Sequence, residues 1–217
     1  MKNTLIALFA TVGLTVSLHA EDGWTSLFNG KDLSGWKSNN ETPDSFLVED
    51  GAIKVNSGRA HLFYVGPDGN ASFKNFEFKA KVKILSTEPG SNSGIYVHTK
   101  FEESGWPSAG YECQVNSTKH KDPKKTGGLY AVKDVLDVSP AADDEWFDYE
   151  IKVQDRSITI KINGVVTSEW TEPEGWDPAT ALKNMPGRKL SEGTIAIQGH
   201  DPQSKVLYKD LFVKVLP

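Results

Sequence analysis

The chain has 217 residues, 38% of them hydrophobic and 24% charged, a composition typical of one globular domain. Its 29 acidic residues outnumber its 24 basic ones, and the net charge of −5 argues against a nucleic-acid binder, because no positive field attracts phosphates. The single cysteine, Cys113, excludes an intramolecular disulfide and a four-cysteine zinc site. We therefore expect the hydrophobic core to stabilise the fold.

Residues 1–20 have the pattern of a secretory signal peptide. Lys2 precedes an apolar run over residues 5–18, and Ala20 stands directly before an acidic pair. A run of roughly 14 apolar residues is shorter than the about 20 residues of a membrane span. We expect cleavage after Ala20, a secreted or periplasmic protein with no membrane contact after cleavage, and a single domain over residues 21–217.

Beyond the signal, apolar and polar residues alternate with a period of two, which predicts antiparallel strands. The strands 76–84 and 147–153 alternate most clearly, with apolar side chains on one face and charged ones on the other. Asp-Gly at 50–51 and Asn-Gly at 163–164 favour tight hairpin turns. Two such sheets, packed face to face, form a β-sandwich.

The longest irregular stretch covers residues 171–192 and is rich in proline and glycine. It predicts a loop with one short helix around residues 179–183. Helical stretches are otherwise nearly absent, and neither an internal repeat nor a low-complexity linker divides the chain. The predicted fold class is all-β.

Three strands, 94–98, 111–116 and 194–200, carry an unusual polar face. Each places apolar residues on one face, whereas the other face holds amide, imidazole, carboxylate or phenol groups in place of Lys and Glu. These residues are Tyr96, His98, Glu112, Gln114, Asn116, Gln198 and His200. Such groups bind sugars, because amides and carboxylates pair with hydroxyls and aromatic rings stack on C–H faces. The alternative is an ordinary solvated face. By the same alternation, Cys113 points into the core.

The remaining histidines and the tryptophans have structural interpretations. His61 and His120 are interpreted as ordinary surface or loop residues, and most tryptophans as core residues. Trp106 lies in the loop before the Glu112 strand and is the best candidate for a sugar-stacking platform. Its alternative is a loop anchor.

The motifs of common hydrolases are missing from the sequence. It contains no Gly-x-Ser-x-Gly elbow, phosphate-binding loop or His-Glu-x-x-His helix. A retaining glycosidase needs two carboxyl groups about 5 Å apart, but Gln114 follows Glu112 at the alternate position. Asp148 and Glu150 share a face, yet that face continues to Lys152 and is typical of a solvated surface.

Several segments, in order along the chain, resemble the secreted 3-keto-disaccharide hydrolase family. The opening, GWTSLFNGKDLSGW at 23–36, is the most specific, and further segments with family-like motifs are 91–96, 110–115, 126–130, 145–150, 162–164 and 197–201. The resemblance implies a concanavalin A-like jelly-roll sandwich of two antiparallel sheets with long loops. It also implies an enzyme acting on glycosides oxidised at C3. Residues 133–137 and 171–192 depart from the pattern and are candidates for shaping substrate choice.

The chemistry that the resemblance implies fits the residues present. A ketone at C3 acidifies the C2 proton, so a base can remove it, the enediolate can expel the O1 substituent, and water can add afterwards. This route needs one base, one acid and oxyanion-stabilising groups. We assign His98 or Glu112 as the base and His200 or Tyr130 as the acid. The expected substrate-binding residues are Tyr96, Trp106, Gln114, Asn116 and Gln198.

The predicted partner is an oligosaccharide or glycoside, and no cofactor is predicted. A divalent cation that polarises the ketone is an alternative version, for which His98, Glu112 and His200 have suitable ligand atoms. Two rival functions remain: a non-catalytic carbohydrate-binding domain, and an ordinary glucanase that cleaves unoxidised sugars.

Overall fold

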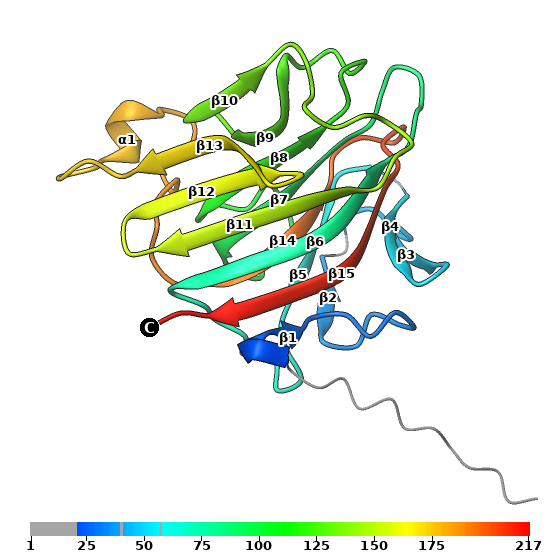
Figure 1. Ribbon diagram of the computed structural model, residues 1–217, viewed down its shortest axis with the longest axis horizontal. Coiled ribbons are helices and arrows are strands. Elements are labelled where there is room, and N and C mark those ends of the chain that lie inside the picture. Colours follow the sequence, from blue (N-terminus) through cyan, green and yellow to red (C-terminus); the bar gives the residue numbers. More distant parts are fainter. Residues whose placement is uncertain (1–20, 40, 57) are drawn as a thin grey trace, which may run out of the picture.

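The computed structural model describes residues 21–39, 41–56 and 58–217, so the predicted signal peptide lies outside the described residues. Two antiparallel sheets pack face to face, as Figure 1 shows. The hydrophobic core lies between them. The expected all-β jelly-roll sandwich is confirmed. None of the helices in the described part is long and apolar enough to span a membrane.

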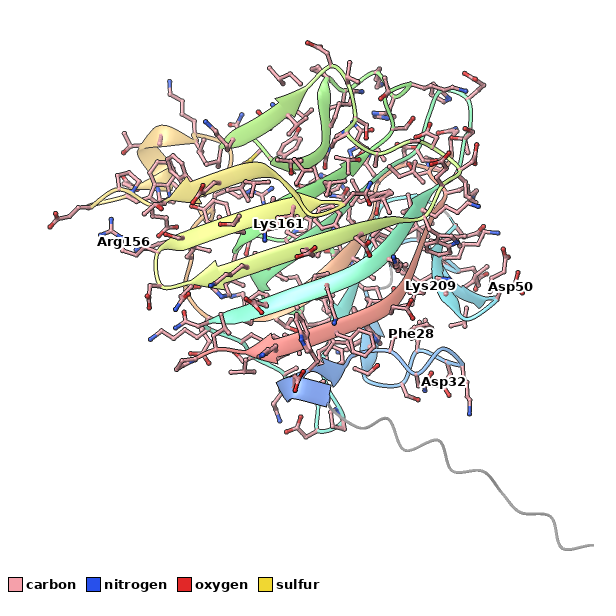
Figure 2. The ribbon with its side chains drawn as sticks, in the orientation of Figure 1. Phe28, Asp32, Asp50, Arg156, Lys161 and Lys209 are labelled. Carbon is pink, nitrogen blue, oxygen red and sulfur yellow. The ribbon has the colours of Figure 1, made fainter. Side chains whose placement is uncertain are left out.

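The first sheet has a core face and a charged outer face. Its strands, in spatial order, are β13 (Val165–Thr171), β12 (Ser157–Ile162), β11 (Phe147–Gln154), β6 (Phe76–Ile84), β15 (Val206–Val215), β4 (Ala52–Val55) and β3 (Phe46–Glu49), with β1 (Thr25–Ser26) paired to β15. Buried residues alternate with more exposed ones along β6 and β11, as predicted. Figure 2 labels two lysines of this sheet, Lys161 on β12 and Lys209 on β15.

The second sheet carries the unusual polar face. Its order is β10 (Lys133–Leu136), β9 (Lys124–Leu129), β8 (Tyr111–Asn116), β7 (Asn92–Thr99), β14 (Thr194–Gly199), β5 (Ala60–Tyr64) and β2 (Trp36–Ser38). Every residue of β7, β8 and β14 is buried. The polar face is therefore covered, and the interpretation as an ordinary solvated face does not fit. Cys113 lies in the core as expected, and burial raises the pKa of its thiol.

Short helices occur at two places in the described residues. A 3-10 turn (Glu21–Gly23) precedes β1, and α1 (Pro178–Ala181) lies within the stretch predicted to be irregular. The Asp177 side chain caps α1 by accepting a hydrogen bond from the Ala179 amide. The short helix predicted around 179–183 thus begins one residue earlier and ends two residues earlier.

A bulge in β7 changes the direction of one predicted site residue. Tyr96 pairs with Ala196 and Thr99 pairs with Thr194, so β7 has one residue more than β14 between these pairs. His98 takes the extra position with a φ of 56°, in the left-handed region. Its side chain then leaves the Tyr96 face, and its ring lies 5.7 Å from that of Phe76. The expectation that Tyr96 and His98 share one face is wrong.

Candidate active site

A pocket of about 500 Å³ lies over the polar face of the second sheet. Its floor consists of side chains from β7, β8 and β14, namely Asn92, Tyr96, Glu112, Gln114 and Gln198. Its walls come from the 106–108 loop, Tyr130, residues 184–188 and His200. The pocket therefore collects seven of the nine predicted site residues: Tyr96, Trp106, Glu112, Gln114, Tyr130, Gln198 and His200.

The Glu112 carboxylate is the centre of the floor and is held by three donors. Its Oε2 accepts hydrogen bonds from the Tyr96 hydroxyl at 2.8 Å and from Arg188 Nη2 at 3.0 Å, and its Oε1 accepts one from Gln198 Nε2 at 2.9 Å. Glu112 and Arg188 are both buried, so they form a desolvated ion pair. Gly94 makes room for it, because a Cβ there would stand 3.1 Å from the Glu112 side chain.

Arg188 lines the pocket but was not among the predicted site residues, because it lies in the irregular stretch, where no strand alternation marks a face. Two tryptophans fix it: Trp176 Nε1 donates to the Arg188 carbonyl at 2.9 Å, and the Trp176 ring packs at 5.4 Å against that of Trp170. Arg188 Nη1 donates to the Gly110 carbonyl at 3.4 Å. The 171–192 segment, predicted as a loop with one short helix and as a candidate for shaping substrate choice, thus builds one wall of the pocket.

His200 and Trp106 both line the pocket, and their ring centroids lie 5.2 Å apart. Trp106 is 43% exposed, which suits a platform for a sugar ring. His200 Nδ1 lies 3.1 Å from Asp201 Oδ2. His120 Nε2 lies 3.5 Å from the same oxygen. His120 does lie in a loop, the connection between β8 and β9, but it is buried beside the site, so its interpretation as an ordinary surface residue is wrong.

His61 is also part of the surroundings of the site and is fully buried. Its ring lies 5.6 Å from the rings of both Tyr96 and Trp106. Neither ring nitrogen has a hydrogen-bond partner among the described residues. Burial lowers the pKa of His61 to about 4, so the imidazole is neutral in the folded protein at neutral pH. Its interpretation as a surface residue is wrong as well.

The two tyrosines of the pocket are hydrogen-bond donors at neutral pH. Burial raises the pKa of Tyr130 to about 12, with a smaller contribution from the negative charge of Asp122. Burial, followed by the charge of Glu112, raises the pKa of Tyr96 far above its ordinary value. Both phenols therefore keep their protons.

His98 and Asn116 do not reach the pocket. His98 Nε2 contacts the Lys74 carbonyl at 2.8 Å, and its Nδ1 accepts the Ser191 amide at 3.0 Å. Asn116 Nδ2 donates to the Lys124 carbonyl at 2.7 Å, so this amide holds the β8–β9 connection. The cation ligand set of His98, Glu112 and His200 does not converge, because His98 faces away.

Comparison with protein families gives one match that spans most of the chain. The model of the 3-keto-alpha-glucoside-1,2-lyase-like domain matches residues 23–214. The chain belongs to this family. The resemblance found in the sequence is thereby confirmed. No curated protein is significantly similar to this lyase-like chain.

Solved structures similar to the lyase-like chain include proteins that act on or bind carbohydrates. A glycosyl hydrolase candidate from Parabacteroides distasonis is 26% identical, with a TM-score of 0.74 over 90% of this chain and 94% of that one. The carbohydrate-binding module CBM66 from Bacillus subtilis is 10% identical, with a TM-score of 0.56 over 83% and 96%. The β-glucanase of Bacillus licheniformis is 11% identical, with a TM-score of 0.56 over 89% and 97%. The last two show the shared fold alone.

The pocket contains one carboxylate among several other polar groups. Glu112 is the sole carboxylate among the described residues that line it, and its neighbours are a guanidinium, amides, phenols and an imidazole. The second carboxylate that a retaining glycosidase requires is not among them. The arrangement can stabilise an oxyanion with Arg188 and Gln198 and can move a proton through His200 or Tyr130.

Proposed function

We propose that the pocket cleaves the glycosidic bond of 3-keto-glycosides, including 3-keto-disaccharides, by elimination followed by hydration. The observation that carries the proposal is the pairing of the one lining carboxylate, Glu112, with Arg188, beside an imidazole at His200. Such a site is poorly suited to displacement by two carboxylates. It suits the removal of an acidic C–H proton next to a ketone, because Arg188 can stabilise the enediolate oxygen.

The roles follow from which atoms are already engaged. Of the two bases predicted from the sequence, His98 lies outside the pocket and Glu112 lines it. His200, predicted from the sequence as an acid, also lines the pocket, and its imidazole can act as a base. Three donors already occupy the Glu112 oxygens. We therefore assign the base to His200, the acid to the Tyr130 phenol, and the orientation of the oxidised ring to Glu112 and Arg188. Trp106 supplies a stacking surface for the sugar.

The bonds and protons balance over two half-reactions. In elimination, His200 takes the C2 proton, the C2–H electron pair forms the enediolate, the C1–O1 bond breaks, and Tyr130 protonates the leaving oxygen. In hydration, water adds to C1 of the resulting 2-hydroxy-3-keto-glucal, Tyr130 recovers a proton from that water, and His200 returns its proton to C2. The sum is hydrolysis.

The deciding experiment compares one disaccharide with its 3-keto derivative. We expect product signals in NMR spectra only for the 3-keto compound. In D₂O the released keto sugar carries deuterium at C2, because the proton on His200 exchanges with solvent between the two half-reactions. The His200→Gln variant should lower kcat by about 10² to 10⁴ with little change in KM. Asp148→Asn, on the outer face of the first sheet, serves as the matched control. Release of sugars from the unoxidised disaccharide would instead identify an ordinary glucanase.

The second candidate is a carbohydrate-binding domain without catalysis. It is favoured by the aromatic and amide lining of the pocket and by the likeness in fold to a carbohydrate-binding module. Calorimetric titration with the 3-keto-disaccharide separates the two functions. Tight binding with no turnover by the wild-type protein supports the binding domain and contradicts the enzyme.

The export pattern of residues 1–20 supports a secreted or periplasmic site of action, and we include it in the proposal. The expected mature protein begins at Glu21 when it is expressed with its own N-terminus. Sequencing the N-terminus of protein recovered from the medium or periplasm checks this. Protein retained in the cytoplasm with Met1 or Lys2 first would contradict it.

A further inference from the structure

The carboxylate of Asp201 lies between two imidazoles at the edge of the pocket. Its Oδ2 is 3.1 Å from His200 Nδ1 and 3.5 Å from His120 Nε2. Its Oδ1 accepts the Gln203 amide at 3.2 Å, which fixes the plane of the carboxylate. Of these side chains, His200 lines the pocket, whereas His120 is buried behind it.

The backbone around His120 assigns its tautomer. His120 Nδ1 accepts the Asp122 amide at 3.2 Å, so the neutral ring carries its proton on Nε2, on the side of Asp201. The carboxylate likewise accepts the Nδ1 proton of His200. His200 is then left with an unprotonated Nε2, which has no hydrogen-bond partner among the described residues.

Lys125 holds the loop that presents His120. Its buried ammonium donates to the carbonyls of Ser117 at 3.0 Å, His120 at 2.7 Å and Asp122 at 2.6 Å. These contacts fix the chain on both sides of the imidazole, including the residue whose amide sets the tautomer. The position of His120 is therefore built by the fold and does not depend on a bound ligand.

We propose that Asp201 and His120 are positioning residues for His200 in the reaction proposed above, on which this inference rests. Asp201 fixes the tautomer and ring orientation of His200 and stabilises the imidazolium formed when Nε2 takes the C2 proton. His120 directs its Nε2 proton toward the same carboxylate, 3.5 Å away, and helps to hold it in place. The other charged or titratable groups near these rings are Asp122, Lys125 and His61.

A shared metal ion is the rival arrangement, since His120, His200 and Asp201 bring ligand-type atoms within 4.8 Å of one another. A metal on His120 Nε2 would require the ring proton on Nδ1. The Asp122 amide already points its own proton at Nδ1, so two donors would face each other. The hydrogen bonds therefore favour proton positioning.

The test uses matched variants of the full protein with a 3-keto-disaccharide. Asp201→Asn keeps the size of the side chain and should lower kcat by about 10² to 10⁴ with KM nearly unchanged. His120→Phe keeps a ring without a donor and should lower kcat by at least about tenfold, whereas His120→Gln can present an amide donor and should recover part of the loss. Asp148→Asn is again the control.

Two readouts distinguish positioning from a general structural role. In Asp201→Asn, the acid limb of the kcat/KM profile should move to lower pH, because the imidazolium loses its counter-charge. In ¹⁵N-histidine NMR of the unliganded protein, the wild type should show the proton of His120 on Nε2 and that of His200 on Nδ1. In the Asp201→Asn variant, the His200 proton should no longer prefer Nδ1.

The outcomes separate this inference from the proposed function. An active wild type whose Asp201→Asn and His120→Phe variants keep normal kcat and pH profiles overturns the positioning role alone. A wild type that is inactive on every 3-keto-glycoside, with the expected tautomers, overturns the proposed function and leaves the geometry standing. Activity that EDTA abolishes and Zn²⁺ or Mn²⁺ restores, with uptake lost in Asp201→Asn, replaces the positioning role with a metal site.

Discussion

The role of Glu112 depends on a partner that lies 76 residues further along the chain. The alternation of β8 is a local property and predicts correctly that Glu112 and Gln114 share the polar face. Arg188 sits in a stretch without periodicity, so no sequence pattern connects it to Glu112. The face on which strand side chains lie was therefore predictable from the sequence, whereas the charged residue that pairs with Glu112 was not.

Removing the Glu112 charge should affect stability as well as turnover. Glu112→Gln leaves Arg188 buried without its counter-ion, which should lower the free energy of unfolding by about 3 kcal/mol. The double variant Glu112→Gln with Arg188→Met should regain most of this stability but no cleavage activity. Urea denaturation and turnover of a 3-keto-disaccharide measure the two effects. Equal stability of Glu112→Gln and wild type would contradict the buried ion pair.

His61 should make the protein sensitive to mild acid. Burial lowers its pKa to about 4 from the ordinary 6.5, so between these pH values the unfolded chain binds the extra proton. Stability is therefore lost as the pH falls through this window, by roughly 2 to 3 kcal/mol at pH 4.5. His61→Phe should remove this part of the loss, measured by urea denaturation at pH 7.5 and pH 4.5. The same acid loss in both proteins would rule the effect out.

Strand alternation fails in β7, because a bulge is a property of strand pairing and not of the strand itself. His98 and Tyr96 are two residues apart, and the extra residue separates their side chains. Tertiary contacts show the same limit: His61 on β5, and His120 and Arg188 in loops, reach the site through contacts that no local pattern encodes. Asn116 faces the predicted side of β8, but the β8–β9 connection uses its amide.

Gly187 should tolerate no side chain, because the 183–190 segment crosses the Trp106 loop at this position. A Cβ on Gly187 would lie 1.7 Å from the Ser108 carbonyl oxygen. The two segments are also joined by a hydrogen bond, in which the Gly187 carbonyl accepts the Gly110 amide at 3.0 Å. Gly187→Ala should push the segment outward, displace Arg188, and raise KM for a 3-keto-disaccharide by about tenfold or more.

The matched control for this crossing is Gly58→Ala, where the nearest atom is the Thr42 hydroxyl at 3.4 Å. We expect wild-type KM for this variant. Kinetics, together with circular dichroism to confirm intact sheets, gives the comparison. A Gly187→Ala protein with wild-type KM would show that the crossing does not position the pocket wall.

At the scale of the whole molecule, the fold class followed from local alternation and turn dipeptides, and the sandwich confirms it. The pocket is harder to predict, because it combines residues 92–130 with residues 184–200, and the walls belong to loops. The hydrophobic pattern specifies which faces meet in the core, but it carries no information about how loops cover the opposite face. The sequence therefore predicts the floor of the site better than its walls.

The burial of Cys113 makes it possible to measure how fast the two sheets separate. The thiol lies between the two sheets with no exposed surface, and it is the only cysteine of the chain. A thiol reagent such as Ellman's can reach it only after the sheets separate, so the labelling rate at saturating reagent equals the rate of that opening. For each variant described above, one absorbance trace of the labelling reaction then gives the rate at which the two sheets separate.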